Sequence, residues 1–109
     1  MEKGPSTYAE YWTSPYNEVK HFNDHGWQMG FENNLVGYSE AAKNLALSED
    51  GNVLAFVRKD GCICKFNTTL RHFVVVNRDG KIVSFYKADL KYFLKEFTKK
   101  GLYKLKGEF

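Results

Sequence analysis

Three turn signals in the second half of the chain constrain the fold more than any other feature. They are Asp60-Gly61, Asn67-Thr68-Thr69 and Asp79-Gly80. They separate four short runs rich in β-branched and aromatic residues, at 53–57, 62–66, 73–77 and 82–86. Strands joined by turns this short run antiparallel to their neighbours. The spacing therefore predicts a four-stranded antiparallel meander.

Helical patterns lie on both sides of this meander. Apolar residues spaced three and four positions apart predict helices over about 16–25, 40–48 and 90–99. Ser39 and Asp89 are suited to cap the second and third helices, and Gly26 and Gly101 to end the first and third. The predicted fold class is α+β, with N-terminal helices packed on one face of a four-stranded antiparallel sheet and a C-terminal helix. We expect the other face, or its rim, to be open to a ligand.

The chain has 109 residues, which is the length of one domain. Residues 1–15 contain several Gly, Pro, Ser and Thr residues and predict a linker or an N-terminal arm, which Tyr8, Tyr11 and Trp12 could anchor. Residues 16–109 form the predicted domain. The sequence contains no apolar run long enough to span a membrane and no signal-peptide pattern. We therefore expect no membrane segment and no export signal in the chain itself.

Charge and cysteine content narrow the classes of function. From Lys81 to the end, eight Lys stand against three acidic residues, so this segment either faces a phosphate backbone or forms a solvated helix face. Cys62 and Cys64 share one face of a predicted strand, where an ordinary disulfide does not form. Two Cys without a second pair make a poor zinc site. We expect reduced cysteines, no bound metal and no cofactor.

Two histidines are the first candidates for catalysis. His21 and His25 are four residues apart and share one face if the helix runs through both. Imidazole is the side chain best suited to proton transfer near neutral pH. The pair lacks the Glu of a zinc-binding H-E-x-x-H motif, and no third ligand is nearby. From these residues alone, an ordinary surface position remains the simpler interpretation for each.

Residues in the predicted sheet add candidates for phosphate binding. Arg58 ends a predicted strand and has the geometry to bind phosphate, although it could equally be an exposed strand-end charge. Thr68 and Thr69 lie in a turn, where hydroxyls bind phosphate or, more commonly, the local backbone.

The last predicted strand contributes a further pair. Ser84 and Tyr86 share one face of this strand, with Phe85 on the core face and Lys87 next in sequence. Together with the histidines, these residues suit metal-independent RNA cleavage, which needs a base, an acid and donors to the phosphorane.

The order of these segments resembles a known family. His21–Gly30, with the sequence HFNDHGWQMG, resembles the H-F-x-x-H-x-x-x-[FM]-G opening of small bacterial toxin nucleases. A helix that ends near Leu47 follows, as in that group. The later matching positions are, in order, Arg58, Gly61, Phe66–Thr69, Phe73–Asn77, Asp79-Gly80, Ile82 and Ser84–Lys87. This order is similar to that of the colicin D-like tRNase domains of contact-dependent inhibition and phage-borne polymorphic toxins, within the barnase–EndoU–colicin–RelE superfamily. The resemblance covers about residues 18–90.

The resemblance implies roles for individual residues. It places catalysis on His25, with His21, Arg58, Ser84 and Tyr86 as further catalytic residues. The residues expected to bind the substrate beside them are Thr68, Thr69, Lys87 and Lys20. The lysines that precede the histidine in that family are replaced here by Phe22 and Asp24, and its final Trp by Tyr86, so Lys20 or the C-terminal lysines would supply the positive charge.

The function implied is a metal-independent ribonuclease toxin that cleaves tRNA. Such a domain is delivered as the C-terminal part of a larger secreted or cell-surface protein and acts in the cytoplasm of the target cell. Its expected partners are tRNA, a cognate acidic immunity protein and, where cleavage requires a host cofactor, a host elongation factor. Two alternatives stay open: a non-catalytic RNA-binding module that uses the same sheet face, and a phage structural or interaction domain in which the histidines are incidental.

Overall fold

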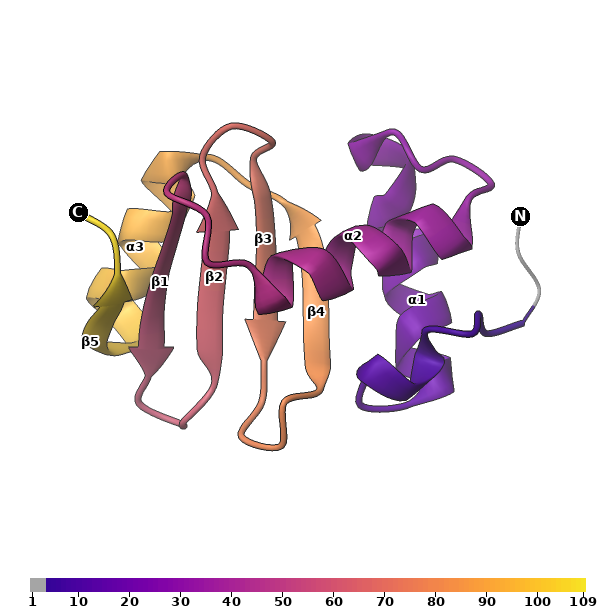
Figure 1. The fold of residues 1–109 in the computed structure, drawn as a ribbon, viewed down its shortest axis with the longest axis horizontal. Coiled ribbons are helices and arrows are strands. Elements are labelled where there is room, and N and C mark those ends of the chain that lie inside the picture. The colour runs from indigo at the N-terminus through magenta and orange to yellow at the C-terminus, as the bar shows by residue number, and fades with distance from the viewer. Residues whose placement is uncertain (1–3) are drawn as a thin grey trace.

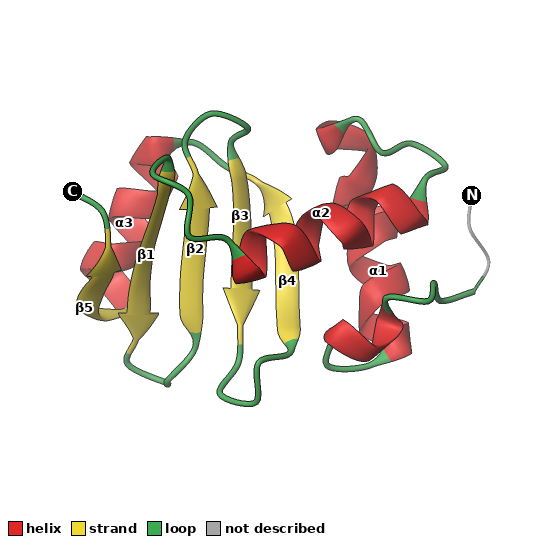
Figure 2. Ribbon diagram, viewed as in Figure 1, coloured by secondary structure: helices red, strands yellow, loops and turns green. Residues whose placement is uncertain are grey.

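The four predicted β runs form neighbouring strands of one sheet. In the computed structural model, which describes residues 4–109, these strands are β1 (Val53–Arg58), β2 (Ile63–Asn67), β3 (His72–Val76) and β4 (Ile82–Lys87). Each pairs antiparallel with the next in sequence. The predicted meander is confirmed, and so is the α+β class (Figures 1 and 2).

A fifth strand extends the sheet beyond the prediction. β5 (Gly101–Lys106) pairs antiparallel with β1, which gives the strand order β4-β3-β2-β1-β5. The helix α3 (Leu90–Lys100) ends at Gly101 as predicted, but Gly101 is extended (φ −74°, ψ 141°) and passes directly into the strand. Most of β5 is exposed, so it lacks the alternation of buried and exposed residues that marks a strand in sequence.

Side-chain caps explain where the helices begin. Asp89 caps α3 by accepting a hydrogen bond from the Tyr92 backbone N–H at 2.8 Å, as predicted. The second helix, α2 (Leu35–Leu47), starts earlier than predicted, because the Asn34 side chain accepts from the Gly37 N–H at 3.0 Å. The prediction of Ser39 as its cap is wrong. Ser39 is buried inside α2.

The first helix, α1 (Pro15–His25), is capped by Ser14, whose hydroxyl accepts from the Asn17 N–H. It ends at Gly26 as predicted. The chain then continues as a short 3-10 helix, η2 (Gly26–Met29), and turns at Gly30, whose φ of 84° suits glycine. This path keeps His25 at the junction between α1 and η2, which lies close to the C-terminal end of β4 (Figure 1).

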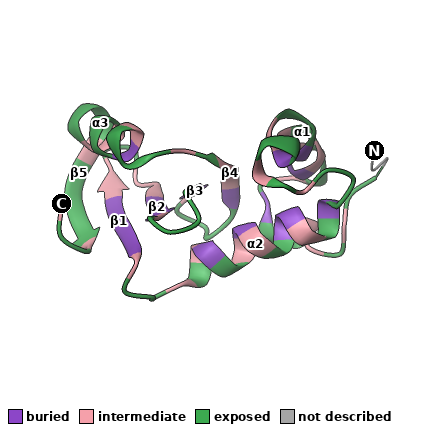
Figure 3. Ribbon diagram, turned by 90° about the horizontal axis from the view of Figure 1, so that it is seen from above, coloured by how far each residue is buried: buried purple, intermediate pink, exposed green. Residues whose placement is uncertain are grey.

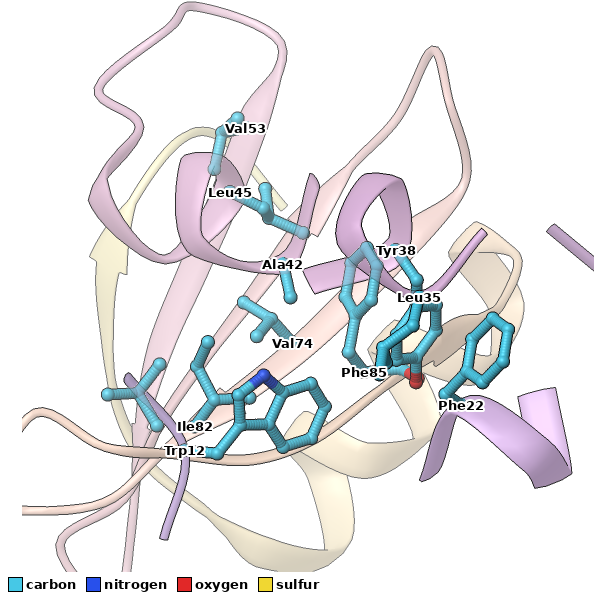
Figure 4. Packing of buried hydrophobic residues seen from close by; sticks show 11 residues of the cluster. Trp12, Phe22, Leu35, Tyr38, Ala42, Leu45, Val53, Val74, Ile82 and Phe85 are labelled. Carbon is cyan, nitrogen blue, oxygen red and sulfur yellow. The ribbon is translucent and has the colours of Figure 1, made fainter. Parts of the chain in front are cut away.

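Two cores lie on opposite faces of the sheet. The first packs Trp12 and the buried sides of α1 and α2 against β1, β3 and β4; its residues are Trp12, Phe22, Leu35, Tyr38, Ala42, Leu45, Val53, Val74, Val76, Ile82 and Phe85 (Figure 4). The second packs Phe93 of α3 against the other face; its residues are Leu54, Phe56, Cys64, Phe66, Phe73, Val75 and Phe93. Figure 3 shows α2 on one side of the sheet and α3 on the other.

The second core corrects one expectation. The face predicted to be open is covered by α3, where the fully buried Phe93 ring lies 5.2 Å from Phe56 and 5.5 Å from Phe66 between ring centroids. Burying an aromatic side chain of this size removes a large apolar area from water, which favours this packing over an open sheet. Tyr86 at the rim of this face is partly exposed, so the rim stays open to a ligand.

The segment before α1 packs against the domain. Its short 3-10 helix, η1 (Ala9–Tyr11), leads to Trp12, which is 2% exposed and forms a bridge with Ile82 of β4. Ser6 binds the buried carboxylate of Glu18 through its backbone N–H (2.9 Å) and its hydroxyl, and Ser39 donates to the same carboxylate at 2.5 Å. Within residues 4–109, no helix has both the length and the apolar character needed to cross a membrane.

Candidate active site

Two histidines and two tyrosines form a cluster that we call the histidine–tyrosine cluster: His21, His25, Tyr86 and Tyr92. The rings of His21 and His25 are stacked, with centroids 5.6 Å apart, and the His25 ring lies 5.5 Å from that of Tyr86. The Tyr86 and Tyr92 hydroxyls are hydrogen-bonded at 2.8 Å. The cluster thus joins α1, β4 and α3 at the rim between the two helices (Figure 3).

Local contacts hold the histidine face of α1 against β4. The Asn17 side chain donates to the Val83 carbonyl of β4 at 2.9 Å, and Phe22 is buried in the first core. His21 and His25 lie on the helical face next to Phe22, so docking of α1 directs both rings toward β4. The Trp12 ring stacks on the other side of His21, with centroids 5.9 Å apart. His21 therefore lies between Trp12 and His25.

Burial shifts the proton equilibrium of both histidines toward the neutral form. It lowers the pKa of His25, with Asp24 acting in the opposite direction. Burial also lowers the pKa of His21, and a positive charge on His25 lowers it further. At neutral pH an imidazole of this kind is unprotonated and can accept a proton, and a proton on one ring disfavours a proton on the other.

Tyr86 is a proton donor, in contrast to the two histidines. Burial and the hydrogen bond with Tyr92 raise the pKa of Tyr86, so its phenol keeps its proton. Its ring is stacked on Phe73 at 5.2 Å, which fixes its position on the sheet. When Tyr92 is the donor in the bond between the two hydroxyls, the Tyr86 proton points to another acceptor. The cluster therefore contains a proton acceptor and a proton donor side by side.

The structure brings some of the predicted site residues together. Ser84 and Tyr86 pair with Val75 and Phe73 of β3 while Phe85 pairs with Val74, so the predicted alternation of faces along β4 is confirmed. Ser84 is half-buried, two residues from Tyr86. Lys87 is exposed at the end of β4, and Lys20 is exposed on α1, where it binds Asp24 at 3.0 Å.

The structure places Arg58 away from this cluster. β1 is three strand positions from β4, which is about 14 Å across the sheet. Arg58 also ends β1 at the opposite end of the sheet from His25 (Figure 1). Its guanidinium binds the Asp60 carboxylate, with one nitrogen–oxygen distance of 3.2 Å. Arg58 is therefore no part of the histidine–tyrosine cluster.

The two threonines of the β2–β3 turn bond their own surroundings. The Thr68 hydroxyl donates to the Asn52 carbonyl at 3.1 Å, and the Thr69 hydroxyl accepts from the Asn52 side chain at 3.0 Å. Each thus has a partner within the protein, as the alternative interpretation of these residues expected. Thr68 still lines a groove at this turn.

Sequence reasoning missed two residues of this region, Tyr92 and Arg71. Tyr92 lies outside the apolar stripe of Leu90, Phe93 and Phe97 that predicts α3, so the helical pattern does not point to it. Its orientation follows from the Asp89 cap, which sets where the first turn of α3 faces. Arg71 follows a turn in which the predicted ligands are Thr68 and Thr69, and the hydrogen bond from the Ala88 N–H to the Arg71 carbonyl places Arg71 beside the end of β4.

The cysteines and possible metal ligands contribute nothing to this cluster. Cys62 and Cys64 are free thiols associated with the second core, and burial raises the pKa of Cys64 to about 12. Among residues 4–109, no three His, Cys, Asp or Glu side chains gather as metal ligands.

No protein-family model matches the chain, and no curated protein is significantly similar to it. Assignment of the site therefore depends on its geometry and chemistry.

The lowered pKa values of the three histidines predict how the stability of the fold depends on pH. Burial lowers the pKa of His21, His25 and His72 in the folded state, so the unfolded chain binds protons more readily near pH 6. The stability that these three neutral histidines contribute should be fully present above about pH 6.5. The free energy of unfolding should fall as the pH drops below that value. We expect the urea midpoint to decrease from pH 8 to pH 5, and to decrease less in His72→Gln. A midpoint that stays constant or rises over this range would contradict the prediction.

Proposed function

We propose that this protein is a metal-independent endoribonuclease that cleaves tRNA. The observation that carries the proposal is the contact between His25 and Tyr86, a proton acceptor and a proton donor whose rings lie 5.5 Å apart at an accessible rim. RNA cleavage of this type needs two such groups. No phosphate-binding loop or dinucleotide motif in the sequence supports a competing chemistry.

In the proposed reaction, the neutral His25 imidazole accepts the proton of a ribose 2′-hydroxyl. The 2′-oxygen attacks the adjacent phosphorus and forms a P–O2′ bond, while the P–O5′ bond breaks. Tyr86 donates its proton to the leaving 5′-oxygen, and the Tyr92 hydroxyl lies 2.8 Å from the Tyr86 hydroxyl as its hydrogen-bond partner. The products are a 2′,3′-cyclic phosphate and a free 5′-hydroxyl. His21 positions His25 by ring stacking.

The biological setting belongs to the same proposal. We propose a toxin domain that reaches the cytoplasm of target bacteria as the C-terminal part of a larger secreted or cell-surface protein. An acidic immunity protein would neutralise it by covering the exposed positive charge beside the cluster, where Lys87 lies at the end of β4. A reading frame for a small acidic protein directly downstream, able to restore growth when expressed together with this chain, would support this part.

The catalytic proposal is tested by incubating the purified protein with unfractionated tRNA in EDTA, with and without a bacterial cytosolic extract. The expected result is a discrete set of fragments ending in 2′,3′-cyclic phosphates, identified by mass spectrometry. Intact tRNA in both arms would contradict it. Salt-sensitive binding to intact tRNA would then favour the RNA-binding module, and no binding at all would favour the structural or interaction domain.

A further inference from the structure

Two adjoining grooves lie next to the histidine–tyrosine cluster. One is lined by Arg71, Lys87, Asp89 and Tyr92, and the other also contains Arg71 and Asp89, with Lys91 at its edge. Their walls come from the β2–β3 turn, the end of β4 and the start of α3. Figure 1 shows these segments at the same end of the sheet as the junction of α1 and η2. We call the two together the Arg71 groove.

The backbone at Arg71 is held in an unusual conformation. Its φ of 61° lies in the left-handed region, which Gly and Asn adopt more readily than Arg. The Arg71 N–H donates to the Asn67 carbonyl at 2.8 Å, and the Arg71 carbonyl accepts from the Ala88 N–H at 2.9 Å. These bonds tie the residue to the turn before it and to the end of β4. The direction in which its side chain leaves the backbone is therefore set by the fold.

The groove carries an excess of positive charge that the protein does not neutralise. Within residues 4–109, Arg71, Lys87 and Lys91 form no ion pair and no side-chain hydrogen bond with any other residue, whereas Arg58 binds Asp60. The one carboxylate in the lining, Asp89, accepts the Tyr92 N–H as a helix cap. Three cations therefore face one carboxylate that is already hydrogen-bonded. Free guanidinium and ammonium groups in a concave surface attract anions.

The groove is connected to the proposed catalytic residues by Tyr92. Its ring lines the groove and lies 5.8 Å from the Tyr86 ring, which lies 5.5 Å from that of His25. Two ring-to-ring steps thus separate the groove from the proton acceptor. Nucleotides in one strand of a duplex follow one another at about 3.4 Å along the axis, so an RNA chain cleaved at His25 reaches the groove within a few nucleotides.

We propose that the Arg71 groove binds the phosphodiester backbone of the RNA substrate next to the cleavage site, with Arg71 as its principal ligand. This inference rests on the proposed ribonuclease function. A guanidinium donates two parallel hydrogen bonds to one phosphate, and Lys87 and Lys91 act as point charges for the phosphates beside it. The role assigned by resemblance to the strand-end Arg58 thus falls to an arginine from another part of the chain.

The test compares three arginine variants of the full chain. Arg71→Asn removes the cation but keeps a residue suited to the left-handed backbone. Arg71→Lys keeps a positive charge without the planar guanidinium. Arg78→Asn removes an exposed arginine from the β3–β4 turn. Binding of unfractionated tRNA is measured in the His25→Ala background, so that cleavage does not consume the ligand. Urea midpoints show whether each variant folds, and Lys91→Gln serves as a second probe should Arg71→Asn not fold.

We expect Arg71→Asn to weaken binding about tenfold and to lower the slope of log K against log salt by about one. Arg71→Lys should lose less affinity, and Arg78→Asn should match the parent. Unchanged binding and unchanged salt dependence in a folded Arg71→Asn would overturn the inference, even if the active enzyme cleaves tRNA. Loss of binding in Arg71→Asn supports the inference even if cleavage is absent, in which case only the catalytic proposal fails.

Discussion

Replacing His25 with alanine is expected to reduce cleavage of tRNA at least about 100-fold while the protein stays folded. Loss of a general base typically costs two to four orders of magnitude in rate. The His25 ring is half-buried at the rim, in contact with His21 and Tyr86, and not in either core. Its removal should therefore affect the chemistry far more than the packing. The measurement is the initial rate of fragment formation, together with the urea midpoint.

His72 provides the matched control, because it is the third histidine of the chain and its ring packs on the first core and not on the face that carries Tyr86. Its ring packs against Phe85 at 5.3 Å and lines a groove that faces α2. Its pKa is lowered by burial, like those of the other two. We expect His72→Gln to retain cleavage within about threefold of the parent. Equal losses in His25→Ala and His72→Gln would show that the effect is structural, and full activity in His25→Ala would remove His25 from the mechanism.

The second large effect is expected on stability, from Trp12→Ala. Trp12 lies in the segment whose composition predicts a linker or arm, yet it is 2% exposed and packs on Tyr38 at 5.9 Å between ring centroids. Truncating a buried Trp or Phe to Ala costs about 3–5 kcal/mol, because apolar contact is lost and a cavity remains. We expect a decrease of that size in the free energy of unfolding. The same change removes the ring stacked on His21, so cleavage by the folded fraction should also fall.

Trp27 makes this prediction specific. It is the other Trp of the chain and is 63% exposed on η2. Trp27→Ala should change the free energy of unfolding by less than about 0.5 kcal/mol. Urea unfolding followed by circular dichroism reports both variants without depending on the fluorescence of the Trp that was removed. Equal stability of the two variants would contradict burial of Trp12.

Local chemistry made much of the fold predictable. The turns at Asp60-Gly61 and Asp79-Gly80 limit how the flanking strands can pair, and the Asp89 side chain caps the residues directly after it. Alternation along β4 places Ser84 and Tyr86 together and Phe85 opposite. Each of these features depends on residues a few positions apart. The pairing of His21 with His25 is of the same kind, since one turn of helix brings them together.

Other features depended on contacts between distant segments. Asn34 caps α2, whereas the hydroxyl of Ser39, the predicted cap, binds Glu18 of α1. β5 is a strand because it pairs with the edge of β1. Sheet order separates Arg58 from His25, although both fit the expected chemistry.

Register and helix docking likewise decided the composition of the candidate site. The pairing of β2 with β3 and the bond from Ala88 to Arg71 turn an arginine toward the end of β4, and packing of α3 brings Tyr92 to Tyr86. The amino-acid sequence thus determined the three main helices, the first four strands and which of their side chains share a face, because these follow from the periods of strand and helix. Only the tertiary structure decided which faces meet, because that depends on how two cores are buried on opposite sides of one sheet.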